Sequence, residues 1–262
     1  MSPKLKSLDY VELNRPTIFA HRGASAYAPE NTLAAFELAV DQGADAIELD
    51  AKLSSDGQVV VIHDDTVDRT TNGTGRVNSL SLSDLASLDA GSRFSSIFPS
   101  QKIPALDDVF EAVGNRIFIN VELTNYSSPR DDLPGKVISL VQKHHLERSV
   151  LLSSFNIIAL IQARNLHPDI ALGFLTQRGE AQAALRTKLF RFGPSLALHP
   201  IGYDITPQLL QTAQHSRCRV HTYTIDRPED MQQLFAMSVD GIFTNDPVLA
   251  KKVLADLRAK NK

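Results

Sequence analysis

Short apolar runs rich in β-branched residues alternate with amphipathic segments along most of the chain. The amphipathic segments repeat apolar residues every three or four positions, as Leu33, Phe36 and Val40 do after the candidate caps Asn31 and Thr32, which is typical of helices that cover a sheet. The apolar runs predict eight strands: Thr17 to Ala20, Ala46 to Asp50, Ile117 to Glu122, Val150 to Ser154, Ile170 to Leu175, Ser195 to His199, Val220 to Ile225, and Gly241 to Thr244. Repeated βα units of this number in 262 residues favour an α/β fold of the TIM, or (β/α)8, barrel type. Periodicity alone leaves a doubly wound open sheet as the alternative.

A ninth apolar run, Val59 to His63, follows the second predicted strand closely. Ser55-Asp56-Gly57-Gln58 is a hairpin signal, and a two-residue turn at Asp56-Gly57 pairs Ser55 with Gln58 and Asp50 with His63. We therefore expect the additional strand to fold back over the second strand. In a barrel, it would return His63 to the rim toward which Asp50 points.

The chain then runs over fifty residues before the next barrel strand, which is long for a connection in this kind of fold. This stretch has helical patterns of its own at Leu82 to Leu88 and Leu106 to Val113. We interpret residues 64–116 as an insertion above the barrel mouth that caps the substrate. No linker or low-complexity tract interrupts the chain, so we expect one domain over residues 1–262 that includes this cap.

The composition is that of a globular protein, with 43% hydrophobic and 22% charged residues. No apolar run approaches the roughly 18 residues of a membrane helix, and Met1 to Tyr10 lacks the apolar stretch of a signal peptide, so we expect a cytoplasmic protein without a stable membrane anchor. A net charge of −3 offers no basic field, which makes nucleic acid an improbable partner. Because Cys218 is the only cysteine, a disulfide within the chain and a cysteine-based zinc site are both excluded.

Acidic residues interrupt two of the predicted strands. The two-residue period of a strand puts Glu48 and Asp50 on one face, and Glu122 ends the next barrel strand. Neighbouring carboxylates repel one another unless a cation lies between them, and burying either one unpaired costs several kcal/mol. The pattern predicts one divalent cation, Mg²⁺ or Ca²⁺, held by Glu48, Asp50 and Glu122. For an isolated pair of this kind, an edge strand with its polar face in water is the alternative.

Two histidines are placed to join these carboxylates. His21 and Arg22 close the first strand, where barrel enzymes hold catalytic residues, although a surface loop with a capping histidine would give the same dipeptide. His63 arrives from the hairpin. An imidazole with a pKa near 6.5 can take or give a proton, so His21 and His63 can divide the base and acid roles, and the planar guanidinium of Arg22 can clamp a phosphate. We expect the other histidines, including His199 and His221, to be structural.

Several motifs together resemble the glycerophosphodiester phosphodiesterases. They are His21-Arg22-Gly23, Pro29-Glu30-Asn31-Thr32, Glu48-Leu49-Asp50, Asp56-Gly57, His63-Asp64, Glu122, Ser154-Phe155, and Asp240-Gly241-Ile242-Phe243-Thr244-Asn245-Asp246-Pro247. The resemblance runs in order from about residue 17 to residue 247. It implies a TIM barrel with a capping insertion that uses a divalent cation. Such enzymes hydrolyse glycerophosphodiesters, for example glycerophosphocholine or glycerophosphoethanolamine, to sn-glycerol 3-phosphate and an alcohol.

By position, the resemblance implies that Glu48, Asp50 and Glu122 bind the metal, that His21 and His63 are the acid/base pair, and that Arg22 contacts the phosphate. The expected reaction is metal-assisted cleavage, in which one histidine deprotonates water or the neighbouring glycerol hydroxyl and the other protonates the leaving alkoxide.

The sequence departs from the family pattern in two places. Thr124 occupies a position where the family often has Lys, and the segment from His221 to Thr224 lacks the Trp that is common in the family.

Two other functions fit the same residues. A lysophospholipase D would accept an acyl chain at the mouth, and Phe94, Ile97 and Phe98 in the insertion could form its entrance. A barrel that binds phosphodiesters without turnover would keep the cation site but release no product. The headgroup, the preferred ion and the oligomeric state stay open.

Overall fold

The computed structural model describes residues 8–98, 100–179 and 196–260. Its strands are β1 (Thr17–His21), β2 (Ala46–Leu53), β3 (Val59–Val61), β4 (Phe118–Leu123), β5 (Val150–Ser154), β6 (Ala171–Thr176), β7 (Leu196–Pro200), β8 (His221–Thr222) and β9 (Gly241–Thr244). Its helices are α1 (Leu33–Asp41), α2 (Leu82–Ser87), α3 (Leu106–Val113), α4 (Leu133–Lys143), α5 (Ile157–Leu166), α7 (Pro207–His215), α8 (Pro228–Ala236) and α9 (Pro247–Lys260). Ser195, the first residue of one predicted strand, lies outside the described residues.

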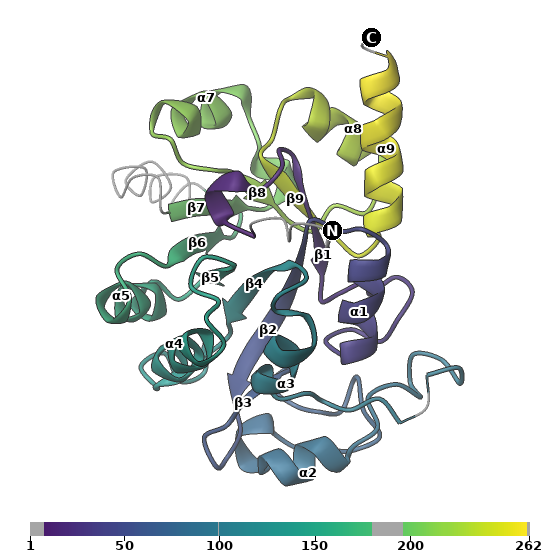
Figure 1. Ribbon diagram of the computed structural model, residues 1–262, viewed down its shortest axis with the longest axis vertical. Helices are drawn as coiled ribbons and strands as arrows, with labels where there is room; N and C mark the ends of the chain where they lie inside the picture. The colour runs from purple at the N-terminus through teal and green to yellow at the C-terminus, as the bar shows by residue number, and fades with distance from the viewer. Residues whose placement is uncertain (1–7, 99, 180–195, 261–262) are drawn as a thin grey trace, which may run out of the picture.

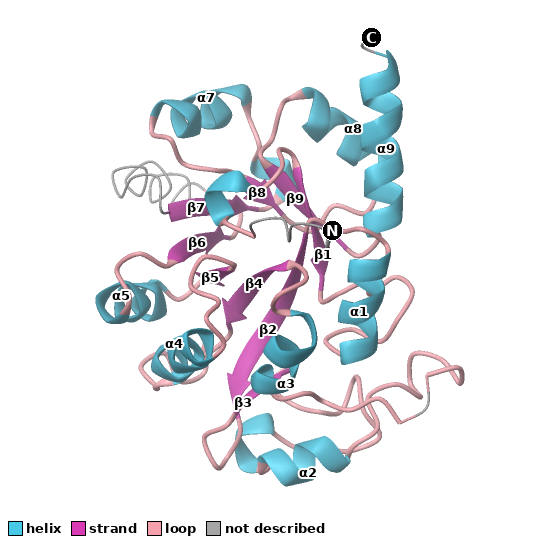
Figure 2. Cartoon of the chain, viewed as in Figure 1, coloured by secondary structure: helices cyan, strands magenta, loops and turns pink. Residues whose placement is uncertain are grey.

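All the strands except β3 form one parallel sheet in the order β7-β6-β5-β4-β2-β1-β9-β8. Parallel bridges from Leu198 to Val220 and from Ile201 to Tyr223 join the segment around β8 back to the β7 side and so close the sheet. Helices surround this central sheet (Figure 1, Figure 2). The fold is therefore the predicted TIM barrel, and the open-sheet alternative is excluded.

Local sequence starts several of these helices at defined residues. Thr32 caps α1 by accepting a hydrogen bond from the backbone N–H of Ala35, and Asn156 caps α5 in the same way through Ile158. Three of the later helices, α7, α8 and α9, begin with Pro. Pro lacks a backbone N–H, and this costs nothing at the first position of a helix, where an N–H would have no acceptor within the helix.

The strands carry alternating residues to two different cores. One face packs against the helices, for example Ile47 and Leu49 against Phe36. The other face lies inside the barrel, where Phe19, Phe118 and other apolar residues of the strands form a separate cluster with Tyr10. Because this interior cluster fills the N-terminal half of the barrel, polar residues further along the same faces are left near the C-terminal rim.

The hairpin between β2 and β3 forms as predicted, but its turn is one residue longer. The backbone N–H of Ser54 bonds to the carbonyl of Gln58, so the loop has three residues, and Gly57 takes the left-handed conformation with φ of +72°. The pairs are consequently Ala51 with Val61 and Leu53 with Val59. The predicted pairing of Asp50 with His63 is wrong, because Asp50 accepts from the backbone N–H of Ile62 and His63 follows just after the end of the ladder.

Residues 64–116 divide between two packing environments. Val67, Val77, Leu85 and Ile103 form an apolar cluster with Val60 of β3. Helix α2, which carries Leu85, lies beyond β3 at the edge of the molecule (Figure 1). Helix α3, in contrast, packs its apolar face into the core between sheet and helices. It contacts α1 and α4 and therefore takes the place of the barrel helix that follows β2.

Among the residues that the structure describes, no helix combines the length and the apolar character needed to cross a bilayer.

Candidate active site

A cavity of about 270 Å³ opens at the C-terminal ends of the barrel strands. It is lined by all six residues that the sequence analysis selected: His21, Arg22, Glu48, Asp50, His63 and Glu122. A larger hollow of about 890 Å³ lies at the opposite end of the barrel, around Tyr10, Arg15 and Arg219. Asp240 is the one acidic residue among the described residues that line it, so this hollow does not offer the group of carboxylates that the other cavity has.

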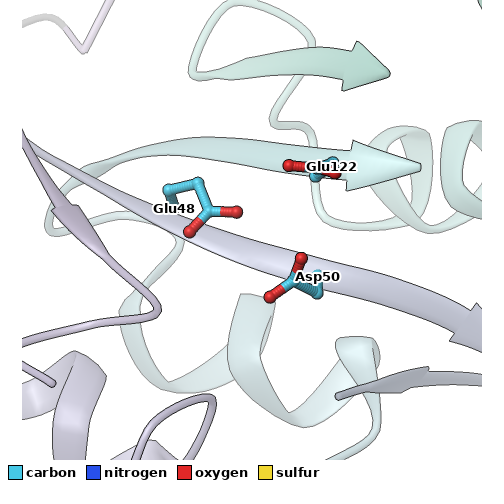
Figure 3. A group of neighbouring side chains, drawn as sticks. All are labelled: Glu48, Asp50 and Glu122. Atoms are coloured by element: carbon cyan, nitrogen blue, oxygen red, sulfur yellow. The ribbon is translucent and has the colours of Figure 1, made fainter. Parts of the chain in front are cut away.

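The three carboxylates converge in this cavity. Parallel pairing of β2 with β4 sets Asp50 directly beside Glu122, and Glu48 lies one inward-facing position earlier on β2 (Figure 3). One oxygen of each carboxylate lies within 4.8 Å of the others. Glu48 and Asp50 are each 2% exposed, so water contributes little to screening their charges.

Burial and repulsion between the carboxylates both disfavour the charged forms of Glu48 and Glu122. Burial, reinforced by the charge of Asp50, raises the pKa of Glu122 to about 8. Burial, with repulsion from Asp50 and Glu122, raises the pKa of Glu48 well above its usual range. Glu48 Oε1 also has no hydrogen-bond donor among the described residues. A hard divalent cation fits these three carboxylates for two reasons. Its positive charge balances theirs, and it prefers oxygen ligands.

Arg22 and Asn31, in the loop after β1, offset part of the negative charge of Glu48 and Asp50. Arg22 Nε lies 3.4 Å from Asp50 Oδ2, and its backbone N–H donates to Glu48 Oε2 at 2.9 Å. The amide of Asn31 donates to Asp50 Oδ2 at 2.8 Å. Both Arg22 and Asn31 have φ of +57°, and a Cβ on the neighbouring Gly23 would lie 2.6 Å from the backbone of Ala35. The tight loop is thus held in a conformation that brings its N–H and its side chains to the carboxylates.

A chain of hydrogen-bonded ion pairs connects Arg22 to His63. Arg22 Nη1 donates to Glu30 at 2.8 Å, and Arg69 makes two bonds of 2.8 Å to the same carboxylate. Arg69 Nε also donates to Asp64 at 2.6 Å, and Asp64 lies 2.7 Å from Nδ1 of His63. Burial opposes ionisation of Glu30, but Arg69 and Arg22 outweigh it and lower the pKa of this carboxyl to about 2.

This network ties the hairpin to the first strand's exit loop. Hydrogen bonds from Arg69 hold the pKa of Asp64 well below its usual range, so the carboxylate is ionised and His63 carries its proton on Nδ1 toward it.

A second network fixes His21. Asn245, just after β9, donates through Nδ2 to Asp226 at 2.6 Å, which turns its oxygen toward His21 Nδ1 at 2.7 Å. His21 therefore donates from Nδ1, and its Nε2 faces Glu48 at 4.0 Å. Burial and the charge of Arg22 lower the pKa of His21, which favours the neutral ring.

Asp226 and Tyr126 escaped the sequence analysis, and Asn245 was named there as part of a family motif without a role in the site. Asp226 and Asn245 follow the last two barrel strands, and that position at the C-terminal rim was the available signal. Tyr126 donates its hydroxyl to Glu122 Oε1 at 2.6 Å. Thr124, which stands where the family often has Lys, instead donates to the backbone oxygen of Ala51.

His199 and His221 are fully buried inside the barrel, and their rings are joined by a 3.2 Å contact between His221 Nδ1 and His199 Nε2. Burial lowers the pKa of His199 to about 3, so the ring is neutral. His199 nevertheless reaches the wall of the 270 Å³ cavity.

Comparison with known proteins gives a consistent result. Residues 21–249 match the Glycerophosphoryl diester phosphodiesterase family. A glycerophosphodiester phosphodiesterase from Caldanaerobacter subterraneus subsp. tengcongensis is 39% identical over 234 residues, which cover 88% of this chain and 94% of that protein. One from Bacillus altitudinis is 34% identical over 245 residues, with coverage of 92% and 99%.

Solved structures agree. A phosphodiesterase from Oleispira antarctica, crystallised with the product sn-glycerol-3-phosphate, superposes with a TM-score of 0.84 at 30% identity and covers 92% of this chain and 97% of its own. A glycerophosphodiester phosphodiesterase from Agrobacterium tumefaciens has a TM-score of 0.75 at 30% identity, with coverage of 90% and 99%.

Proposed function

Because the chain belongs to the glycerophosphoryl diester phosphodiesterase family, we propose that it hydrolyses glycerophosphodiesters to sn-glycerol 3-phosphate and an alcohol. The observation that carries the proposal is the convergence of three carboxylates, two histidines and one arginine on a single cavity. Of the relatives, the Oleispira antarctica protein was solved with this product. Glycerophosphocholine and glycerophosphoethanolamine are the substrates to test first.

Glu48, Asp50 and Glu122 would hold one divalent cation, Mg²⁺ or Ca²⁺. When bound, such an ion offsets charge on the phosphate oxygens and lowers the pKa of an oxygen nucleophile. The cluster of acidic groups supports this assignment because its electrostatics are unfavourable without a cation.

The two histidines would move the protons. His21 is neutral and directs Nε2 into the site, so it is placed to accept a proton from the attacking oxygen, whether that oxygen belongs to water or to the adjacent glycerol hydroxyl. His63, oriented through Nδ1 by Asp64, would give a proton from Nε2 to the leaving alkoxide, a step that requires the doubly protonated imidazolium form of the ring. Arg22 would bind the phosphate, since its buried Nε–H lies 3.4 Å from Asp50 Oδ2 but makes no hydrogen bond within the described part of the chain.

The contacts of Arg69 support a capping role for the first part of residues 64–116. Arg69 extends from this segment to Glu30 beside the site, so the segment and the site share one network. The apolar cluster of Val67, Val77, Leu85 and Ile103 gives the segment a core of its own. The cytoplasmic location and the lack of a nucleic-acid partner stay predictions.

A lysolipid substrate is the second candidate, and the exposure of Phe94 (44%) and Ile97 (76%) is the observation that favours it. These residues belong to the segment before α3 and do not line the described cavity. If lysolipids are the substrates, acylated glycerophosphocholine will be hydrolysed faster than glycerophosphocholine. If the barrel only binds phosphodiesters, neither compound will release product.

In the presence of chelator, Glu122 should make the protein less stable as the pH rises from about 6.5 to 8. Its pKa is about 8 in the folded protein and near 4.5 in the unfolded chain, so in this interval folding retains a proton that unfolding releases. We expect the free energy of unfolding to fall by up to about 2 kcal/mol relative to Glu122→Gln. His21, whose pKa is lowered, acts in the opposite direction, but only below about 6.5.

Thermal melts of both proteins at pH 6.5 and pH 8, with chelator and with Mg²⁺ or Ca²⁺, measure this effect. The cation should raise the Tm of the wild type more at pH 8 than at pH 6.5, because it replaces the retained proton. Parallel pH profiles for the wild type and Glu122→Gln would contradict the assignment of a raised pKa to Glu122.

A further inference from the structure

A layer of polar side chains lies inside the barrel at the level of the carboxylates, with Asn120 beside Glu48 and Ser153 beside Glu122. Asn120 on β4 pairs with Glu48 and precedes Glu122 by one inward-facing position. Ser153 on β5 and His199 on β7 extend the layer around the barrel. These side chains are at most 1% exposed, and Asn120, Ser153 and His199 all line the 270 Å³ cavity.

The hydrogen bonding of this layer is incomplete within the described residues. Asn120 donates through Nδ2 to Ser153 Oγ at 2.9 Å, but its Oδ1 has no protein donor. His199 uses Nε2 toward His221, and its Nδ1 has no protein partner. A buried polar atom left unpaired costs about 1–3 kcal/mol, so both atoms favour a polar group inside the cavity.

The surroundings select a neutral, compact polar group. The apolar interior cluster of Phe19, Phe118 and their neighbours closes the barrel below this layer. Phe155, Leu175 and Tyr223 form another wall of the cavity. Of the described charged residues that line the cavity, Glu48 is the one that pairs with Asn120, and it belongs to the carboxylate cluster. Hydroxyl groups fit this floor, because a hydroxyl can donate to Asn120 Oδ1 and can either donate to or accept from His199 Nδ1, whichever tautomer the ring adopts.

Gly173 on β6 leaves the space that the ring of His199 occupies. A Cβ at this position would lie 2.5 Å from Cε1 and 2.8 Å from Nε2 of His199. Only glycine lets the imidazole lie against the strand.

We propose that Asn120 and His199 bind the free hydroxyl groups of the glycerol moiety and thereby restrict the site to phosphoesters of a polyol. This inference rests on the proposed function, since it requires the phosphate to lie at the neighbouring carboxylates. Hydroxyl recognition by a buried polar pair discriminates strongly, because an analogue without the hydroxyls leaves both protein groups unpaired.

Calorimetric titration separates binding from turnover. With saturating Mg²⁺ or Ca²⁺, we expect wild-type protein to bind sn-glycerol 3-phosphate at least about ten-fold more tightly than n-propyl phosphate, which lacks both hydroxyls. The ratio of the two Kd values should fall to about two or less in Asn120→Leu. The exposed control Asn78→Ala should keep the wild-type ratio.

His199→Phe provides a second test if Asn120→Leu does not fold, since a phenyl ring fills the same space without Nδ1, and it should also lower the ratio. A wild-type ratio near one, or an unchanged ratio in the folded variants, would overturn the inference. If the wild type shows the preference but does not hydrolyse glycerophosphodiesters, the proposed function fails while hydroxyl recognition stands.

Discussion

His21→Ala and His63→Ala are each expected to lower kcat for hydrolysis of glycerophosphocholine by at least about 100-fold. Each change removes a group that would transfer a proton. His21 presents Nε2 to the site because Asn245 holds Nδ1, and His63 is oriented by Asp64. Steady-state kinetics with a coupled assay for glycerol 3-phosphate measures the loss.

The fold should survive both changes, because neither histidine belongs to an apolar core cluster. Circular dichroism and thermal melts of the variants check this point. His215→Ala, at an exposed position on α7, is the matched control and should keep wild-type turnover. Near-normal kcat in His21→Ala or His63→Ala would remove that histidine from the mechanism.

Asp50→Asn and Glu122→Gln are expected to lower turnover by at least about 100-fold at cation concentrations that saturate the wild type. Each substitution preserves the shape of the side chain but removes one of three negative charges that favour the cation. Asp50→Asn also keeps an oxygen for the amide of Asn31. Activity titrated with Mg²⁺ and with Ca²⁺ measures both the maximum rate and the cation concentration required.

Glu111→Gln, on the exposed face of α3, is the control for loss of one acidic charge. It should leave the cation requirement unchanged. If Asp50→Asn and Glu122→Gln respond to the cation as the wild type does, the metal site lies elsewhere.

The carboxylate cluster could be predicted because it follows from local rules. A strand places Glu48 and Asp50 on one face whatever the rest of the fold, and parallel pairing then sets Asp50 beside Glu122. The alternation of strands and helices favoured a barrel but left an open sheet as the alternative, which the bridges from Leu198 to Val220 and from Ile201 to Tyr223 exclude. The structure shows in addition that apolar residues fill the barrel interior toward the N-terminal ends of the strands. The carboxylates are therefore buried, and the pKa of Glu122 is raised.

The hairpin shows where local rules fail. Asp56-Gly57 predicts a turn, but whether the loop has two or three residues depends on the pairing that Ser54 makes with Gln58 and on the conformation of Gly57. One residue in the loop shifts the whole register, so His63 lies beyond the ladder instead of opposite Asp50.

The support of His21 could not be predicted from a local pattern. Asn245 is 224 positions from His21 in the chain, and only closure of the barrel between β1 and β9 brings the two together. The different positions of α2 and α3 within residues 64–116 could not be predicted from a local pattern either. The sequence of α3 predicts an amphipathic helix, but only its contacts with α1 and α4 show that it belongs to the barrel.

Release of sn-glycerol 3-phosphate from glycerophosphocholine, measured with the purified protein across a titration of Mg²⁺ and of Ca²⁺, tests the central claim most directly. We predict release that depends on one of these ions, stops in excess chelator, and is at least about 100-fold slower in Asp50→Asn. Equal release with and without chelator, or no release with any divalent ion, would contradict the assignment of this cavity as a cation-dependent phosphodiesterase site.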